Sequence, residues 1–151
     1  MFSSMNVESI GNIGGVKFMS DIIAVIEKLE GLKHLPVLTE REISDAESEL
    51  GVKFAAEFVE YTLRFGAISA HGIELTGVVS SPRLNVVKVT LSERALNPEI
   101  PDDMYVIENT GVDGVIMLQD SDGKIYESAP NSKPVKKFSS LSEYLREYLR
   151  E

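Results

Sequence analysis

The chain has 151 residues, the usual size of a single domain, and it is long enough to bury a substantial core. Hydrophobic residues make up 43% of the chain and charged residues 26%, as in ordinary soluble globular proteins. No apolar run is long enough to span a bilayer, and the first residues lack the pattern of a signal peptide. The absence of cysteine excludes disulfides and thiolate metal sites, so we expect a cytoplasmic protein.

The net charge is −9, and the acidity is concentrated in the middle of the chain. Residues 38–127 carry seventeen acidic and seven basic side chains, a net charge of −10, whereas residues 128–151 carry three acidic and five basic ones. Such a field repels nucleic acid and anionic membranes and attracts basic partners. The alternative is that the acidity only keeps the protein soluble.

The first nineteen residues are expected to form a poorly structured lead-in, followed by one domain over residues 20–151. Glycines at positions 11, 14 and 15 favour a flexible joint over a phosphate-binding loop, because no strand precedes them and no Gly-Lys-Ser/Thr follows. A first helix is predicted to begin at Ser20 and to carry apolar residues at positions 22, 23, 25, 26 and 29. Gly31 and Pro36 are expected to end it.

Residues 38–77 predict two helices and then a strand. Thr39 and Glu42 have the spacing of a capping box, and Gly51 is placed to end the helix that follows. The second helix ends at Gly66 and carries aromatic residues at helical spacing, which we expect to be core rather than a ligand cage. These aromatic residues are Phe54, Phe58, Tyr61 and Phe65. From Gly72 the apolar period changes to two, which predicts a strand.

The rest of the chain predicts further strands and two helices. Residues 78–84 read as a loop, residues 85–90 as a strand, and residues 90–96 as a short helix capped by Thr90 with Glu93. Strands are expected at 104–108, 115–119 and 124–127, joined by turns that each contain Asp-Gly. A proline-containing loop then leads to a final helix capped by Ser140 with Glu143. The predicted fold is a single α+β domain, an antiparallel sheet with helices packed on one face.

No set of residues has the spacing of a catalytic or metal site. Ser69 and His71 lie two positions apart, but they lack the Gly-x-Ser-x-Gly context of a nucleophile elbow. Asp120, Asp122 and Gly123 resemble the start of a calcium loop, but no acid follows at its twelfth position, and a hairpin turn explains them. Acid pairs such as 102–103 read as solvated surface. We therefore expect no catalysis, no metal and no cofactor.

The order of these motifs is similar to that of the SUKH superfamily, which includes fungal cell-wall-assembly regulators and bacterial toxin-immunity proteins. The shared pattern is an acidic capped helix with Glu-x-x-x-Gly, an aromatic helix, and a strand that starts with Gly-Ile-Glu. The residues that carry it are Glu47, Gly51, Phe54, Phe58, Tyr61, Phe65, Gly66, Gly72, Ile73, Glu74 and Gly77. The resemblance covers about residues 20–149. The chain departs from the family at Phe54-Ala55, where Leu-Pro is usual.

The resemblance implies an immunity-type binding protein that neutralises a toxin by direct contact and without chemistry. A basic protein, most simply a nuclease, is the expected partner, because an acidic inhibitor complements a surface that binds phosphate. No nucleic acid or membrane is expected to bind, and the oligomeric state is left open. The expected contacts are Glu74, Glu108, Asp113, Asp120 and Asp122, chosen for charge and predicted exposure. The alternative function is a non-catalytic regulatory or scaffolding module.

Overall fold

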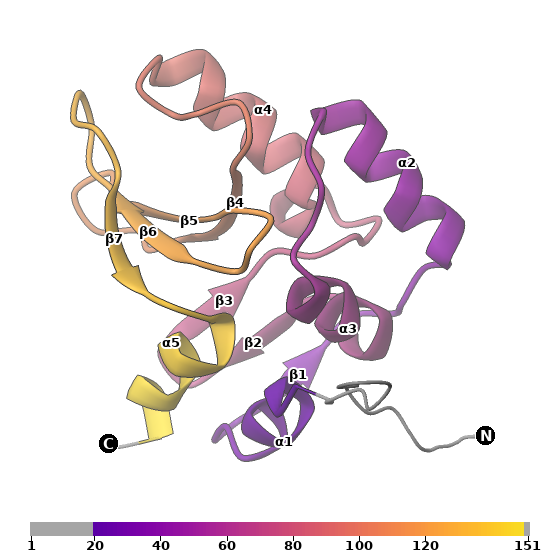
Figure 1. Cartoon of the computed structure of the whole chain (residues 1–151). Helices are drawn as coiled ribbons and strands as arrows, with labels where there is room; N and C mark the ends of the chain where they lie inside the picture. The colour runs from indigo at the N-terminus through magenta and orange to yellow at the C-terminus, as the bar shows by residue number, and fades with distance from the viewer. Residues whose placement is uncertain (1–19, 150–151) are drawn as a thin grey trace, which may run out of the picture.

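The computed structural model describes residues 20–149, and the predicted lead-in over residues 1–19 lies outside this range. The helices are α1 (Ile22–Glu27), α2 (Glu40–Leu50), α3 (Ala56–Phe65), α4 (Val86–Leu96), α5 (Leu141–Leu149) and the 3-10 turn η1 (Pro82–Leu84). The strands are β1 (Lys33–His34), β2 (Ile68–Ala70), β3 (Ile73–Leu75), β4 (Tyr105–Asn109), β5 (Ile116–Gln119), β6 (Ile125–Ser128) and β7 (Val135–Phe138). Figure 1 shows their arrangement in space.

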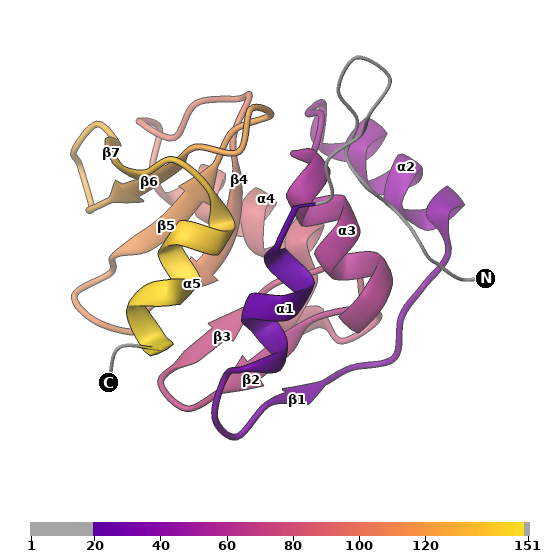
Figure 2. The ribbon, with the colours of Figure 1, turned by 60° about the horizontal axis from the view of Figure 1, so that its bottom comes forward.

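All strand pairs within the two sheets are antiparallel, and the α+β class predicted from the sequence is confirmed. The strands are divided between two sheets rather than one, in the orders β1-β2-β3 and β4-β5-β6-β7. Helices cover both faces of the larger sheet. Val89 of α4 packs with Val106 and Leu118 on one face, while Tyr105 on the other face joins the core that contains α3 and α5. Figure 2 shows α1 between α3 and α5, both of which it contacts.

The predicted start and end of α2 and the predicted end of α3 at Gly66 are confirmed, whereas Phe54 lies just before α3 and not within it. Thr39 and Glu42 form the reciprocal capping box, and Gly51 ends α2 in the left-handed conformation. The buried face of α2 and the aromatic face of α3 then meet in one core. The charged residues of α2 are mostly acidic, because its eleven residues include five acidic side chains and one basic side chain, Arg41.

The prediction of a strand over residues 85–90 and a short helix after it is wrong, because α4 is one continuous helix. Asn85 starts it, with its side-chain oxygen accepting the backbone N–H of Lys88 at 3.0 Å. The β-branched Val86, Val87 and Thr90 suggested a strand, but they share the buried face of α4. Packing against the sheet outweighs their weak preference for extended structure. The hydroxyl of Thr90, expected to cap a helix, instead accepts the N–H of Val106 at 2.9 Å.

Three short strands were not predicted. No strand was expected directly before β3 or between α1 and α2, but β2 and β1 form there and pair with each other, with His34 opposite Ile68. The proline-containing segment after β6 includes β7, whose residues pair with β6. Strand β7 is an edge strand with exposed Lys136 and Lys137, and lysines at an edge disfavour further strand pairing. The first helix also ends earlier than expected, at Glu27 rather than near Gly31.

Two glycines allow the backbone to pass unusually close to itself beneath α3. Gly66 has φ 73°, and a Cβ atom there would lie 2.6 Å from the carbonyl oxygen of Leu35. A Cβ atom at Gly77 would lie 1.8 Å from the carbonyl oxygen of Gly66. Both contacts involve backbone atoms, which cannot move aside as a side chain can. A side chain at Gly66 would therefore separate the end of α3 from the segment that follows β1, and one at Gly77 would separate it from the loop that follows β3.

We expect Gly66→Val to lower the free energy of unfolding by more than about 1 kcal/mol, because of its positive φ and the backbone contact. Gly51→Val is the matched control, since Gly51 has φ 70° but nothing within 4 Å of the added Cβ. Urea titration of both variants measures the two losses. An unchanged midpoint for Gly66→Val, or a loss no larger than that of Gly51→Val, would contradict the steric argument.

Candidate partner-binding surfaces

Glu74 is the predicted contact that the structure places on a groove. Its carboxylate holds the guanidinium of Arg83 in a bidentate pair, with N–O distances of 2.5 and 3.0 Å. The side chains of Glu74 and Arg83 are 43% and 67% exposed, so a partner can reach the pair. Arg83 was not predicted from the sequence, because nothing about a loop residue nine positions after Glu74 indicates that it folds back onto β3.

Glu108 is buried, so its predicted exposure is wrong. The residue is 4% exposed, and its carboxylate accepts hydrogen bonds from the hydroxyl of Tyr144 and, at 3.2 Å, from the backbone N–H of Glu74. Burial raises the pKa of this carboxyl above its usual range, against the two hydrogen bonds, which lower it. Glu108 thereby joins β3, β4 and α5 from inside the protein, and it presents no charge to a partner.

The three aspartates of the hairpin turns differ in what they can contribute to binding. Asp113 is exposed at the tip of the β4–β5 turn with φ 54°, which confirms the positive backbone angle predicted there. Asp122 has a side chain 77% exposed and lies 3.8 Å from the amine of Lys124. Asp120 is half-buried, and its carboxylate accepts the N–H groups of Asp122 and Lys124 and the hydroxyl of Tyr126 at 2.9 to 3.0 Å. Asp120 is therefore a turn-forming residue.

The first surface depression, which we call the α4 groove, is a hollow of about 530 Å³ between β3, η1, α4 and the β4–β5 turn. It is lined by Glu74, Thr76, Pro82, Arg83, Leu84, Lys88, Val89, Ser92, Glu93, Asn109 and Gly111. Asp113 lies on the turn that contributes Gly111, so two of the five predicted contacts belong to this region. Its ionisable lining is balanced, with two acidic and two basic side chains.

The second depression, the α2–α3 groove, has a volume of about 560 Å³. It is lined by Glu40, Ile43, Ser44, Glu47, Lys53, Phe54, Ala56, Val59 and Ser121. Ser121 belongs to the β5–β6 turn, which brings Asp122 beside this groove. The five predicted contacts therefore do not form one patch: the two turns lie at opposite ends of β5, and Glu108 is inside the protein.

Among residues 20–149 the structure gives no sign of a catalytic or metal centre. Ser69 lies in β2 and His71 in the turn after it, and no hydrogen bond joins their side chains. No group of three or more histidine, aspartate or glutamate residues in this range could hold a metal ion. None of the helices in the described range has the length and apolar character that crossing a membrane requires.

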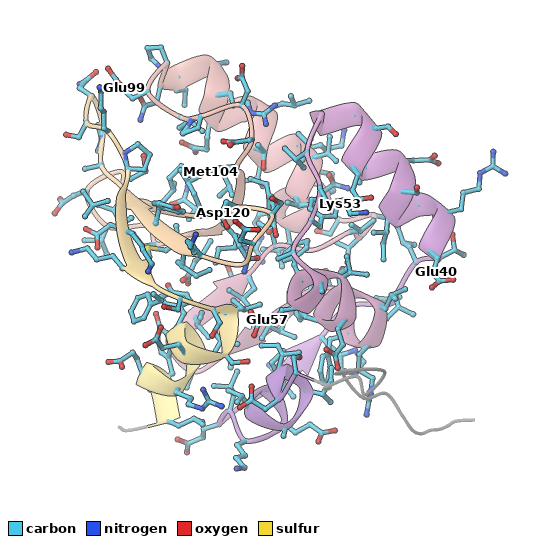
Figure 3. The ribbon with its side chains drawn as sticks, in the orientation of Figure 1. Glu40, Lys53, Glu57, Glu99, Met104 and Asp120 are labelled. Atoms are coloured by element: carbon cyan, nitrogen blue, oxygen red, sulfur yellow. The ribbon has the colours of Figure 1, made fainter. Side chains whose placement is uncertain are left out.

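Two acids that were not predicted as contacts have structural roles. Glu47 accepts the backbone N–H of Phe54 at 2.8 Å and so fixes the connection between α2 and α3. Glu57, labelled in Figure 3, accepts the N–H groups of Leu141 and Ser142 at 2.6 and 3.1 Å. It therefore caps α5 from another helix, a role that no local sequence signal reveals because the partners are more than eighty residues apart.

The raised pKa of Glu108 predicts a pH dependence of stability. The unfolded chain releases this proton near its ordinary value of 4.5, whereas the folded protein holds it to higher pH. The contribution of Glu108 is therefore full below pH 4.5 and is lost as the pH rises through the raised pKa. We expect the stability of the wild type, relative to Glu108→Gln, to fall as the pH rises above 4.5 and through the raised pKa.

Urea titrations of the wild type and Glu108→Gln at several pH values measure this slope. Tyr144→Phe removes a hydrogen bond that lowers the pKa of Glu108, so this pKa should rise further and the total decline in stability should be larger than in the wild type. The groups that face this carboxyl are Glu74, Tyr144 and, beyond it, Tyr148, whose hydroxyl lies 3.5 Å from that of Tyr144. Parallel stability curves for wild type and Glu108→Gln would contradict the assignment.

The hydrogen bonds of Asp120 predict that this acid stabilises the fold. Asp120→Ala should cost about 1–3 kcal/mol, because it leaves two N–H groups and a hydroxyl without their acceptor. Asp122→Ala, two residues away and exposed, should change stability by less than about 0.5 kcal/mol. Thermal melts of the two variants decide this, and equal melting temperatures would argue against the role of Asp120.

Comparison with known proteins identifies the family. Residues 19–150 match the model of the family SUKH_5, described as SMI1-KNR4 cell-wall. A search of curated proteins gave no match. The family model spans nearly the whole described structure, including both grooves and every residue that carried the resemblance. The chain therefore belongs to the SUKH_5 family of SMI1-KNR4 domains.

Proposed function

We propose that this chain is an immunity-type protein that binds a toxin and blocks it by covering its surface. Membership of the SUKH family is the observation that carries the proposal, since that family includes toxin-immunity proteins. The partner is a basic protein, most simply a nuclease, and the complex forms in the cytoplasm. No chemistry is involved, because inhibition requires only that the toxin cannot reach its substrate.

The charge distribution supports a basic partner. A nuclease surface must be basic to hold phosphate groups, and residues 38–127 of this chain carry a net charge of −10. Opposite fields of this kind raise the association rate and favour the correct orientation on encounter. Asp113, Asp122 and Glu74 are the predicted contacts that remain reachable at the surface. Glu108 and Asp120 act on the partner only indirectly, by holding the strands and turn that carry the exposed acids.

The description of the family as cell-wall supports a second candidate, a regulatory module that binds a protein of cell-wall assembly. Both candidates are non-catalytic binding proteins, and they differ in the partner. The product of a neighbouring toxin gene separates them, because only an immunity protein binds it and suppresses its activity. Failure of the purified chain to bind or inhibit that toxin would favour the regulatory candidate.

If the toxin is basic, exposed acids should steer association. Asp122→Lys reverses one charge, and Asp113→Asn removes another while tolerating φ 54°. We expect the double variant to associate about two- to tenfold more slowly at low salt, with a weaker dependence on salt than the wild type. Stopped-flow association with the inactivated toxin, from low to physiological salt, measures both effects.

Glu30→Lys is the control for this measurement, because Glu30 is exposed beside β1, at the edge of the sheet that carries neither turn. It reverses a charge away from the two turns and should slow association less. Rates that depend on salt but ignore positions 113 and 122 would place the contact elsewhere on the acidic surface. Rates indifferent to salt would remove the electrostatic argument for a basic partner.

A further inference from the structure

The α2–α3 groove has an apolar floor beneath a polar rim. Ile43 and Phe54 belong to the hydrophobic core and are 5% and 2% exposed, and half-buried Val59 packs against the same core. Glu40, Lys53 and Ser121 surround this floor at the surface. Figure 3 places Glu40 at the start of α2 and Lys53 on the segment that leads to α3. An apolar centre inside a polar rim is the arrangement in which binding energy concentrates at protein interfaces.

The charge around this groove suits a basic occupant. Helix α2, which forms one wall, contributes Glu40 and Glu47 to the lining. Its other three acids line a different depression, beside α4. Glu40 forms no ion pair among residues 20–149 that would neutralise it. Asp122 lies next to Ser121 on the third side and is 77% exposed. Lys53 is the one base in the lining, opposite Glu40 and Glu47.

The α4 groove is a weaker candidate for the same partner. Its most prominent acid, Glu74, already holds Arg83 in a bidentate pair, so a partner's cation would have to displace that guanidinium. Lys88 adds a second positive charge to the lining. In the α2–α3 groove Glu40 forms no ion pair among residues 20–149 and Asp122 has a single contact with Lys124 at 3.8 Å, so a partner's cation has less to displace. The core-derived floor of this groove is already formed. The acidic rim and the apolar floor of the α2–α3 groove together favour a partner segment that is apolar at its centre and basic on either side.

We propose that the α2–α3 groove receives an apolar side chain of the toxin, from a segment that carries basic residues on either side. The apolar side chain contacts half-buried Val59 above the buried Ile43 and Phe54, and the flanking cations lie against Glu40 and Asp122. This inference rests on the proposed immunity function and names the surface that performs it. Steering acids then act mainly on the association rate, and the filled groove acts mainly on dissociation.

Two serines of α2 provide a matched test. Ser44 lines the groove, whereas Ser48 is one turn further along the same helix, equally classed as exposed and not part of the lining. Ser44→Arg and Ser48→Arg change the net charge equally, so any loss of steering is about the same in both. Only Ser44→Arg places a bulky side chain over the floor. We expect Ser44→Arg to raise the dissociation constant at least about tenfold more than Ser48→Arg, through faster dissociation.

The measurement is surface plasmon resonance with the inactivated product of the neighbouring toxin gene, and circular dichroism melts confirm that each variant folds. If Ser44→Arg is unstable, Ala56→Gln partly fills the groove from an exposed position on α3 without a change in charge. Dissociation that is faster only in the groove variants is the expected result. Equal dissociation of both serine variants would overturn the groove while leaving the proposed function intact.

Two other outcomes bear on the occupant. If the wild type does not bind the toxin at all, the proposed function fails, and the inference about the groove fails with it. Light scattering of the free protein tests whether a second copy of this chain occupies the groove. A dimer that is lost in Ser44→Arg and retained in Ser48→Arg would replace the toxin with self-association and overturn the proposal.

Discussion

The aromatic cluster around α3 determines where both sheets lie. Tyr61 is fully buried, and its hydroxyl accepts the N–H of Ile68 at 3.1 Å and donates to the carbonyl oxygen of Thr76 at 2.8 Å. One side chain of α3 therefore satisfies backbone groups at the start of β2 and just after β3. Tyr105 does the same for the other sheet, since its hydroxyl accepts the N–H of Ala55 at 2.9 Å and donates to the side chain of Gln119.

These hydroxyls are more than incidental polar atoms in an apolar core. An unpaired buried N–H costs about 1–3 kcal/mol, so Ile68 and Ala55 can be buried only if an acceptor reaches them. The rings meanwhile pack together, with Phe54, Phe58 and Tyr105 at centroid distances of 4.8 to 5.0 Å. Packing and hydrogen bonding thus require the same positions of α3 relative to the strands. The departure from the family at position 55 fits this account, because proline there would have no N–H for Tyr105.

The sequence predicted best those features whose cause is local. The capping box and Gly51 define α2 from residues a few positions apart, and the turn glycines do the same for the hairpins. The misassigned segments depend on distant partners. The first part of α4 was predicted as a strand because it is rich in β-branched residues, and these residues are buried where α4 packs against β4. Glu57 looked like an ordinary surface acid because its partners on α5 are far along the chain.

Glu108 shows why the candidate site could be predicted only in part. Strict alternation along β4 would place it on the face opposite Ile107, but the pairing of β4 with β5 shifts register between Val106 and Glu108. The irregularity leaves Glu108 opposite Met117, which belongs to the main core. An extra residue in a strand changes which face every later side chain occupies, and no residue in this segment signals it. Choosing contacts by charge alone therefore selected Glu108, an acid that is buried and stabilises the fold.

The same distinction separates the two roles that acids have on this protein. Glu47, Glu57, Glu108 and Asp120 all accept backbone N–H groups, so removing any of them alters the scaffold before it alters the surface. Glu40, Asp113 and Asp122 are exposed and can differ between relatives at little cost to folding. A binding protein built in this way can change partners by changing its rim acids while the acids that hold its helices, strands and turns stay in place. The apolar floor between α2 and α3 belongs to the core as well as to the surface, and it supplies a fixed centre around which such a rim can vary.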